Sequence, residues 1–401
     1  MEFTNSYQLI KGLYSFKGYC LAGFHDLPER VMVVLEKTGK TGQCPRCFRK
    51  RQRFESRYTR EIRDLDIVGK KSVIMFPTGV VHCFCGYRGV ELLDFVDKHS
   101  NFTKRFEECV ALLCDKMTNK NVAEVCRIDW KAVKTIDKKF LSRQKVGLDD
   151  ISPAGIGVDE VAYEKGQKYL TIVRELEHNR VIWIGIERKK EVLDLFFAEL
   201  GPERSAKITE AVMDMWDPYI ASIKEHCPNV AIVFDKFHIS KKVNEALDSI
   251  RKTEFRKAGE DERKTMKKKR FLILKRQRTL TSDEAEALDA LKQKNDRLYS
   301  AYLLKEQVLD IFDEENQETA IKRFEMWFEN IMYSGLTQFD KVVKTIKMYF
   351  YGIENYFRHR ITNAGAEGIN NKINVIKRMA YGYRDLEYFK LKILRTCGWK
   401  S

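Results

Sequence analysis

The sequence contains no apolar run approaching the length of about 18 residues that is typical of a membrane-spanning helix. Its first residues, 1–5, are polar and lack the apolar core of a secretory signal peptide. We therefore expect a cytoplasmic protein that has no membrane partner. In that reducing compartment its ten cysteines are not expected to form a disulfide framework, which leaves buried thiols or a metal site.

Acidic residues are outnumbered along the chain. The 401 residues include 73 Lys and Arg against 58 Asp and Glu, which gives a net charge of +15. The excess is clustered: residues 46–63 hold eight basic and two acidic side chains, and residues 263–278 hold nine basic and no acidic ones. An ordinary basic enzyme is the alternative for the overall charge, but clustering favours a polyanionic partner such as nucleic acid.

Four cysteines form two short knuckles, Cys44 with Cys47 and Cys83 with Cys85, on either side of predicted strands at 72–76 and 80–83. Four thiolates on two turns supply the tetrahedral set that Zn²⁺ prefers, and binding would staple a small β-rich module. Because the second knuckle is tighter than the usual Cys-x-x-Cys, His82 is an alternative ligand. The knuckles thus predict a structural zinc site.

Residues 103–140 read as three short helices, of which the last, 130–139, is basic and amphipathic. Their spacing is typical of a helix-turn-helix, in which the last helix reads the major groove of DNA. Lys131 and Lys134 are the candidate contacts on that helix. A plain helical linker is the alternative.

From residue 156 the pattern changes to that of an α/β layer architecture. We predict strands at 156–159, 169–173, 181–186, 211–214 and 230–235, with helices at 190–200 and 218–226. Strand signals vanish between 240 and 360, where a helical period and a scarcity of proline predict an all-helical insertion. The basic run 263–278 falls there, and its alternatives are contact with DNA phosphates or a solvated helix face.

Carboxylates occur where these buried strands stop, a costly position unless they bind a cation. Asp159 ends the first predicted strand, Asp214 the fourth and Asp235 the fifth. We take Asp214 before Asp235 as the partner of Asp159, with Asp217 also nearby. Alternation along the strand predicts that Glu160 points to the opposite face from Asp159, in a substrate or structural role.

A third acidic position is Glu367, in the first turn of a helix predicted at 364–379 after Asn363, a good N-cap residue. The alternative is that an acidic residue there only interacts favourably with the helix dipole; the strand-end aspartates favour a metal role instead. One face of this helix carries Glu367, Asn371, Asn374 and Arg378, and the opposite face carries Ile369, Ile373 and Ile376. The isoleucines are expected to bury, while the polar face meets a polyanion.

These residues together resemble the ISL-three family of bacterial insertion-sequence transposases, nearly from end to end. The resemblance rests on the segments 44–47, 56–65, 157–160, 196–203, 213–215, 234–238 and 362–372. It implies a multidomain α/β protein: an N-terminal zinc ribbon (1–98), a helix-turn-helix (99–145), and a ribonuclease-H-like catalytic core (152–240 and 359–401) interrupted by a helical insertion (241–358). Residues 235–238 resemble the Asp/Cys-x-x-His element of related transposases.

The resemblance also implies a DDE active site of Asp159, Asp214 and Glu367 that binds Mg²⁺ or Mn²⁺, with His238 and Asp235 beside it. The expected function is cleavage at the terminal inverted repeats of the element and strand transfer into target DNA by a homodimer, associated with the nucleoid when bound. A DNA-binding regulator and a structure-selective nuclease are the alternatives. Predicted DNA contacts are Arg49, Arg51, Arg53, Arg57, Arg60, Lys131, Lys134, Lys267, Lys268, Lys269, Arg270 and Arg378.

Overall fold

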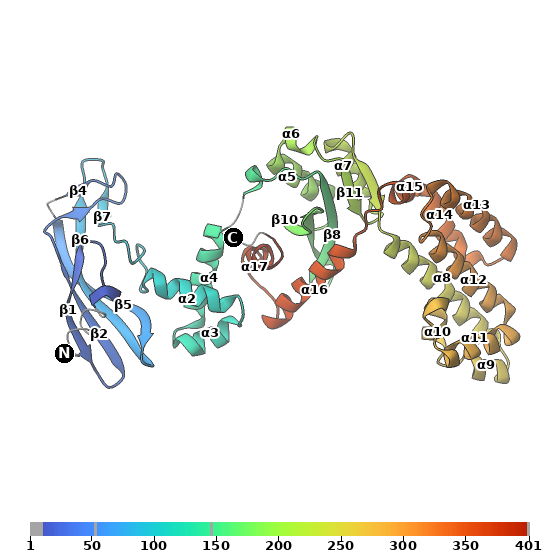
Figure 1. Ribbon diagram of the computed structural model, residues 1–401, viewed down its shortest axis with the longest axis horizontal. Helices are drawn as coiled ribbons and strands as arrows, with labels where there is room; N and C mark the ends of the chain where they lie inside the picture. Colours follow the sequence, from blue (N-terminus) through green and yellow to red (C-terminus); the bar gives the residue numbers. More distant parts are fainter. Residues whose placement is uncertain (1–10, 52–53, 145–146, 399–401) are drawn as a thin grey trace. The chain divides into compact units, whose positions relative to one another are not determined.

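The computed structural model describes residues 11–51, 54–144 and 147–398 (Figure 1). The chain divides into two units, Met1–Gln144 and Lys145–Ser401, and each is considered by itself. Within the described ranges, no helix is both long enough and apolar enough to cross a membrane.

The first unit begins with a twisted β-sheet in the order β1-β2-β6-β5, with β7 paired to β6. Its strands are β1 (Tyr19–Asp26), β2 (Arg30–Lys37), β5 (Phe54–Ile67), β6 (Lys70–His82) and β7 (Arg88–Val90), beside a small pair β3 (Gly42–Gln43) and β4 (Lys50–Arg51). The prediction of two separate strands at 72–76 and 80–83 was wrong, because β6 runs through both. Gly79 permits this: a Cβ there would lie 2.4 Å from the Ser56 carbonyl oxygen of β5.

Three helices follow the sheet, as predicted: α2 (Lys104–Cys114), α3 (Asn119–Cys126) and α4 (Trp130–Gln144). Thr103 and Thr118 cap the first two with their hydroxyl oxygens, and Arg127 ends α3 in the left-handed conformation before a short turn to α4. Phe106, Val110 and Val133 belong to the core that the three helices share. The helices therefore form a compact bundle of helix-turn-helix type.

The second unit contains a five-stranded sheet in the order β10-β9-β8-β11-β12. The strands β8 (Gly155–Glu164), β9 (Lys168–Glu175) and β10 (Arg180–Ile186) form an antiparallel meander, while β11 (Glu210–Met213) and β12 (Ala231–Phe234) run parallel to β8. All five overlap the predicted strands, but β8 continues five residues beyond its predicted end, so Asp159 lies inside the strand and not at its end as predicted. An apolar, β-branched composition explains them, since both faces of this sheet are covered.

Helices cover the two faces of this sheet (Figure 1). On one face lie η1 (Leu148–Asp150), α5 (Lys190–Leu200), α6 (Pro202–Ser205) and α7 (Asp217–His226), with Phe196 and Tyr219 in the shared core. On the other face lie α16 (Ala364–Met379) and α17 (Leu386–Cys397), whose Ile373 and Phe389 pack against Leu170 of β9. The unit is thus a three-layer α/β/α structure.

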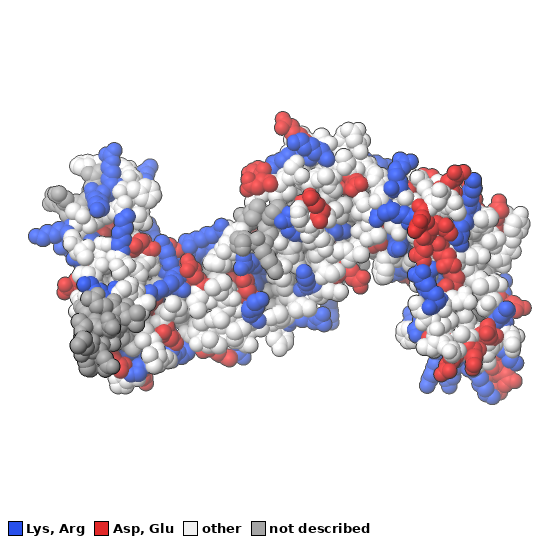
Figure 2. Space-filling view, viewed as in Figure 1, with Lys and Arg blue, Asp and Glu red and all other residues white. Residues whose placement is uncertain are grey.

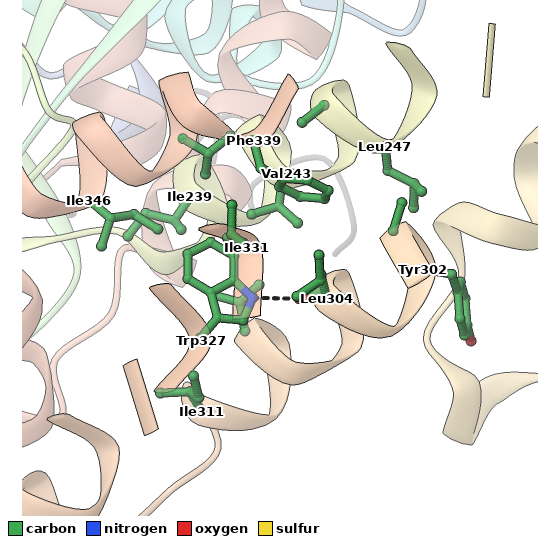
Figure 3. Packing of buried hydrophobic residues seen from close by; sticks show 14 of the residues in the cluster. Ile239, Val243, Leu247, Tyr302, Leu304, Ile311, Trp327, Ile331, Phe339 and Ile346 are labelled. Carbon is green, nitrogen blue, oxygen red and sulfur yellow. Dashed lines mark hydrogen bonds between the residues drawn. The ribbon is translucent and has the colours of Figure 1, made fainter. Parts of the chain in front are cut away.

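Between β12 and α16 the described chain is helical, as predicted. The elements are α8 (Lys236–Lys257), α9 (Glu260–Met266), α10 (Arg270–Leu274), η2 (Gln277–Thr279), α11 (Ser282–Lys294), α12 (Asp296–Ile311), α13 (Gln317–Ser334), η3 (Thr337–Phe339), α14 (Asp340–Met348) and α15 (Phe350–His359). They pack around Trp327, whose Nε1 donates to the Leu304 carbonyl oxygen over 2.8 Å (Figure 3). Asn355 of α15 donates to the Ile232 carbonyl oxygen of β12 over 2.9 Å, which ties the helical region to the sheet.

Candidate active site

Asp159 and Asp214 are brought together by the register of two parallel strands. Met213 of β11 lies opposite Val158 of β8, so the next residue of each strand is an aspartate beside the other. The carboxylates of Asp159, Asp214 and Glu160 lie within 4.8 Å of one another. Among the described residues, neither aspartate forms an ion pair with Lys or Arg. A group of carboxylates in which neither aspartate pairs with Lys or Arg offers the negatively charged oxygen ligands that a hard divalent cation binds.

The position of Glu160 differs from the prediction. Strand alternation was expected to separate it from Asp159, yet its carboxylate lies in the same group. Its side chain is one methylene longer than that of Asp, and Arg188 pairs with it over 2.5 Å. The Arg188 guanidinium in turn stacks 3.9 Å from the ring centre of Trp216. Glu160 therefore has a guanidinium partner, whereas neither aspartate forms a described ion pair with Lys or Arg.

Asp235 and His238 flank the pair from the β12–α8 junction. Asp235 caps α8 by accepting a hydrogen bond from the Phe237 amide over 3.0 Å. That cap starts the helix so that His238 Nε2 lies 2.6 Å from Asp214 Oδ1. Burial alone would lower the pKa of His238, but contact with Asp214 outweighs it and raises the pKa above the usual value. The imidazole therefore orients Asp214.

Asp159 is held at both oxygens. Its Oδ1 accepts from the Glu160 amide over 2.7 Å, and its Oδ2 accepts from Asn370 Nδ2 over 2.8 Å. Burial raises the pKa of Asp159, and the neighbouring Asp214 carboxylate raises it further. Burial also raises the pKa of Asp235. Clustered carboxylates of raised pKa are typical of sites whose charge is completed by a ligand.

Glu367 lies outside the carboxylate group and is exposed in the first turn of α16. Asn370, one turn further along the same helix, makes the contact to Asp159, so α16 crosses the site with Glu367 next to it in the helical register. Asn370 was not predicted from the sequence as a site residue. Its position three residues after Glu367 on the same helix was the signal that could have identified it. Ile369 and Ile373 are buried, which confirms the predicted apolar face.

Asn363 precedes α16 as predicted, but its side chain does not cap the helix. Its Oδ1 accepts from Arg174 Nη2 over 2.6 Å instead. The competing donor is a charged guanidinium, which makes a stronger hydrogen bond than a backbone amide does. The N-cap role was therefore the wrong interpretation of a correctly placed residue.

The four knuckle cysteines converge in the first unit. The Sγ atoms of Cys44 and Cys85 are 3.6 Å apart and those of Cys47 and Cys83 are 3.4 Å apart, with all four within 4.8 Å of one another. Tetrahedral zinc with bonds of about 2.3 Å separates its sulfur ligands by about 3.8 Å, close to this spacing. His82 is exposed and is not part of the group. The residues fit a four-thiolate zinc centre.

The predicted DNA contacts of the first unit differ in their surroundings. Arg49, Arg57 and Lys131 are exposed. Arg60 donates to the Ser100 carbonyl oxygen over 2.6 Å, so it holds the chain that leads into α2. Lys134 is half-buried. Arg53 and the side chain of Arg51 lie outside the described residues.

The basic run 263–278 divides into free and paired charges. Lys275 pairs with Glu284, Arg276 with Asp310 and Asp313, and Arg270 with Asp248 over 3.5 Å. Lys267, Lys268 and Lys269 have no ion-pair partner among the described residues, and the first two are exposed. Basic and acidic side chains are interspersed over much of this helical region (Figure 2). Arg378 is exposed on α16 and donates to the Asn374 carbonyl oxygen over 3.3 Å.

Residues 156–393 match a family model described as "Transposase", and residues 91–141 match one described as "Helix-turn-helix domain of transposase family ISL3". The chain is 31% identical over 394 residues to the transposase for insertion sequence element IS1001 of Bordetella parapertussis, covering 96% of this chain and 97% of that protein. The chain belongs to the ISL3 family of transposases. The transposase for IS1557 of Mycobacterium tuberculosis is 26% identical over 369 residues, covering 85% of this chain and 82% of that protein.

The family assignment confirms the transposase activity, the helix-turn-helix and the DDE-type domain predicted from sequence. The matched segment 156–393 contains Asp159, Asp214 and Glu367, and it spans the helical region as well as the sheet. A DDE transposase domain implies the use of a divalent metal, which agrees with the group of carboxylates that β8 and the residue after β11 bring together.

Proposed function

We propose that this transposase binds the terminal inverted repeats of its insertion sequence, cleaves DNA there, and joins the freed ends to target DNA. The observation that supports it most is the pairing of Asp159, within β8, and Asp214, directly after β11, whose carboxylates lie within 4.8 Å of each other and form no described ion pair with Lys or Arg. Phosphoryl transfer requires a concentration of negative charge that can hold divalent cations beside the scissile phosphate.

The catalytic core is proposed to be ribonuclease-H-like. A three-stranded antiparallel meander followed by two parallel strands, in the order β10-β9-β8-β11-β12, supports this assignment. The first aspartate then belongs to the first strand, the second follows the fourth, and the helical insertion begins directly after the fifth, at α8.

The proposed metal ligands are Asp159, Asp214 and Glu367, and the metal is Mg²⁺ or Mn²⁺, since carboxylate oxygens suit both. Ions held by these residues would supply activation of the attacking hydroxyl and stabilisation of the leaving oxygen. We prefer Asp214 to Asp235 as the second ligand because Asp235 Oδ1 is engaged in capping α8. His238 holds Asp214, and Asn370 holds Asp159, so each aspartate is oriented by one further side chain.

We propose that the first unit supplies end recognition. Zinc held by Cys44, Cys47, Cys83 and Cys85 would fix the knuckles beside the basic strands, and α4 would enter the major groove. Lys267, Lys268 and Lys269 would contact phosphates from the helical insertion. Symmetric element ends favour a homodimer on DNA, acting in the cytoplasm and associated with the nucleoid when bound.

The test is an assay with purified protein, Mg²⁺ and labelled element-end DNA, scored separately for cutting and joining. We expect cleaved ends and, with target DNA present, strand-transfer products. A protein that binds these ends without cutting them would be a regulator, and one that cuts without joining would be a nuclease. Either result would overturn the proposal.

A further inference from the structure

A buried guanidinium lies beneath the carboxylate site without a carboxylate partner. Arg174 of β9 is 3% exposed and forms no ion pair among the described residues. Its Nη1 donates to Asn179 Oδ1 over 2.9 Å and its Nη2 to Asn363 Oδ1 over 2.6 Å, while its buried Nε has no hydrogen-bond partner. A buried charge bound only by two amides is costly and calls for a functional reason.

Two glycines make room for this arrangement. A Cβ on Gly157, which faces Arg174 across the β8–β9 pair, would lie 2.5 Å from Arg174 Nε. A Cβ on Gly365 would lie 2.3 Å from Asn179 Oδ1. Both contacts are shorter than real Cβ atoms tolerate, so any larger residue would displace the guanidinium or its amide partner. The network therefore explains why glycine stands two residues before Asp159 and two residues before Glu367.

The network connects the β9–β10 hairpin to the beginning of α16. Arg174 and Asn179 belong to the hairpin, and Asn363 is the residue from which α16 starts. Because Asn363 makes no side-chain cap, the Arg174 contact is its main side-chain anchor. Seven residues later Asn370 contacts Asp159, so a shift at Asn363 moves the helix that meets the site.

The charge of Arg174 also faces the site. Burial lowers the pKa of Arg174, and the carboxylates of Asp159 and Asp235 oppose that change. The guanidinium is thus close enough to feel these two carboxylates but does not pair with either. It leaves them available to other ligands.

We propose that Arg174 is a positioning residue of the transposase: through Asn363 it fixes the first turns of α16, and thereby the approach of Glu367 and Asn370 to Asp159. The part that concerns Glu367 rests on its proposed role as a metal ligand. A displacement of about 1 Å at a reacting centre can cost about 10²-fold in rate.

The experiment uses the full chain with Asn363→Ala and Arg174→Lys. Asn363→Ala removes the acceptor at the start of α16 and leaves Arg174 bound to Asn179. Arg174→Lys keeps the charge but lacks the planar fork that reaches both amides. Arg180→Lys is the matched control, because Arg180 lies in the same hairpin and pairs with Glu175.

Three quantities are measured: affinity for element-end DNA, the single-turnover cleavage rate across a Mg²⁺ titration, and hydrogen exchange of the amides at 364–370. Both variants should bind ends normally, cleave about 10²-fold more slowly, need more Mg²⁺ for half-maximal rate, and exchange faster at 364–370. Arg180→Lys should match the unmodified protein in all three. In a Glu367→Gln background, Asn363→Ala should cause a smaller further loss of rate, because only the Asn370 contact with Asp159 is left to be disturbed.

Normal cleavage together with normal exchange in Asn363→Ala and Arg174→Lys would overturn the inference. Normal cleavage by Glu367→Gln would instead contradict the proposed role of Glu367 as a metal ligand, without deciding the role of Arg174. Hydrogen exchange at 364–370 then still decides the role of Arg174, because unchanged exchange in both variants would mean that it does not fix α16.

Discussion

Asn370 Nδ2 donates a hydrogen bond to Asp159 Oδ2 over 2.8 Å, joining two residues that are 211 positions apart. The whole helical insertion lies between them in the chain, yet α16 returns to pack on the sheet beside β8. This contact links the helix that presents Glu367 to the strand that presents Asp159. The insertion can therefore vary in the chain without separating the two halves of the site.

Replacing Asn370 with alanine is expected to slow cleavage of bound DNA by about 10-fold to 10²-fold, because Asp159 loses the donor that orients it. End binding should be unchanged. The measurement is single-turnover cleavage at saturating DNA. Asn330→Ala is the control, since Asn330 of α13 is exposed and its side chain donates to Gln307 rather than to Asp159. Equal rates for the two variants would show that Asn370 does not orient the aspartate.

Cys47→Ser or Cys85→Ser should release about one zinc per chain, because a structural site needs all four thiolates. Affinity for element ends should fall as the knuckles loosen. Zinc content by elemental analysis is the readout. Cys20→Ser, at a cysteine outside the group, should keep its zinc. A measurement of no zinc in the unmodified protein would contradict the proposed zinc centre.

Lys267, Lys268 and Lys269 are expected to bind DNA phosphates through charges that no side chain of the described protein neutralises. Changing all three to alanine should weaken binding to any DNA sequence and flatten the log–log salt dependence by roughly 0.9 per lost contact. The matched control changes Lys252, Lys275 and Lys322, which pair with Asp248, Glu284 and Glu318. Its slope should stay near that of the unmodified protein. A slope that falls equally in both triple variants would argue against a specific phosphate site.

Asp64→Ala should loosen the attachment of the helix-turn-helix to the sheet. Asp64 is fully buried and accepts from Thr103 Oγ1 over 2.6 Å and Arg105 Nε over 2.8 Å. Removing one partner of such a pair costs about 3 kcal/mol of unfolding free energy, to be measured by hydrogen exchange of β5 and α2 in the full chain. Asp26→Asn, which breaks the exposed pair with Lys70, should cost less than about 1 kcal/mol.

Much of the second unit could be predicted from the sequence because its elements have strong local signals. The helix at Ala364–Met379 begins and ends where the isoleucine period and the flanking residues place it, and α5 matches its predicted range. Asp159 and Asp214 could be paired because each follows an apolar run of a predicted strand, although Asp159 lies inside β8 rather than at its end. Local pattern was sufficient there.

Other features depended on contacts that are remote in the sequence. Arg188 donates a hydrogen bond to the Glu160 carboxylate, and this contact helps to keep Glu160 beside the aspartates. The two residues are 28 positions apart, so the alternation of side chains along one strand does not predict the pairing. The side chain of Asn363 accepts a hydrogen bond from Arg174, 189 positions away, instead of capping α16. Likewise, the basic run 263–278 reads as uniform in sequence, whereas acidic partners from α11, α12 and the following turn neutralise part of it. Partner identity, rather than secondary structure, was what the sequence could not provide.

We propose that Glu367, although exposed and outside the carboxylate group, completes the site with Asp159 and Asp214. Glu160 is the competing third carboxylate, since it lies within 4.8 Å of both aspartates but is paired with Arg188. The decisive measurement compares Glu367→Gln with Glu160→Gln in Mg²⁺-dependent cleavage and joining of labelled element ends. Glu367→Gln should lose at least about 10³-fold in rate while still binding ends, and Glu160→Gln should lose far less. The reverse order would contradict the account and assign the third ligand to Glu160.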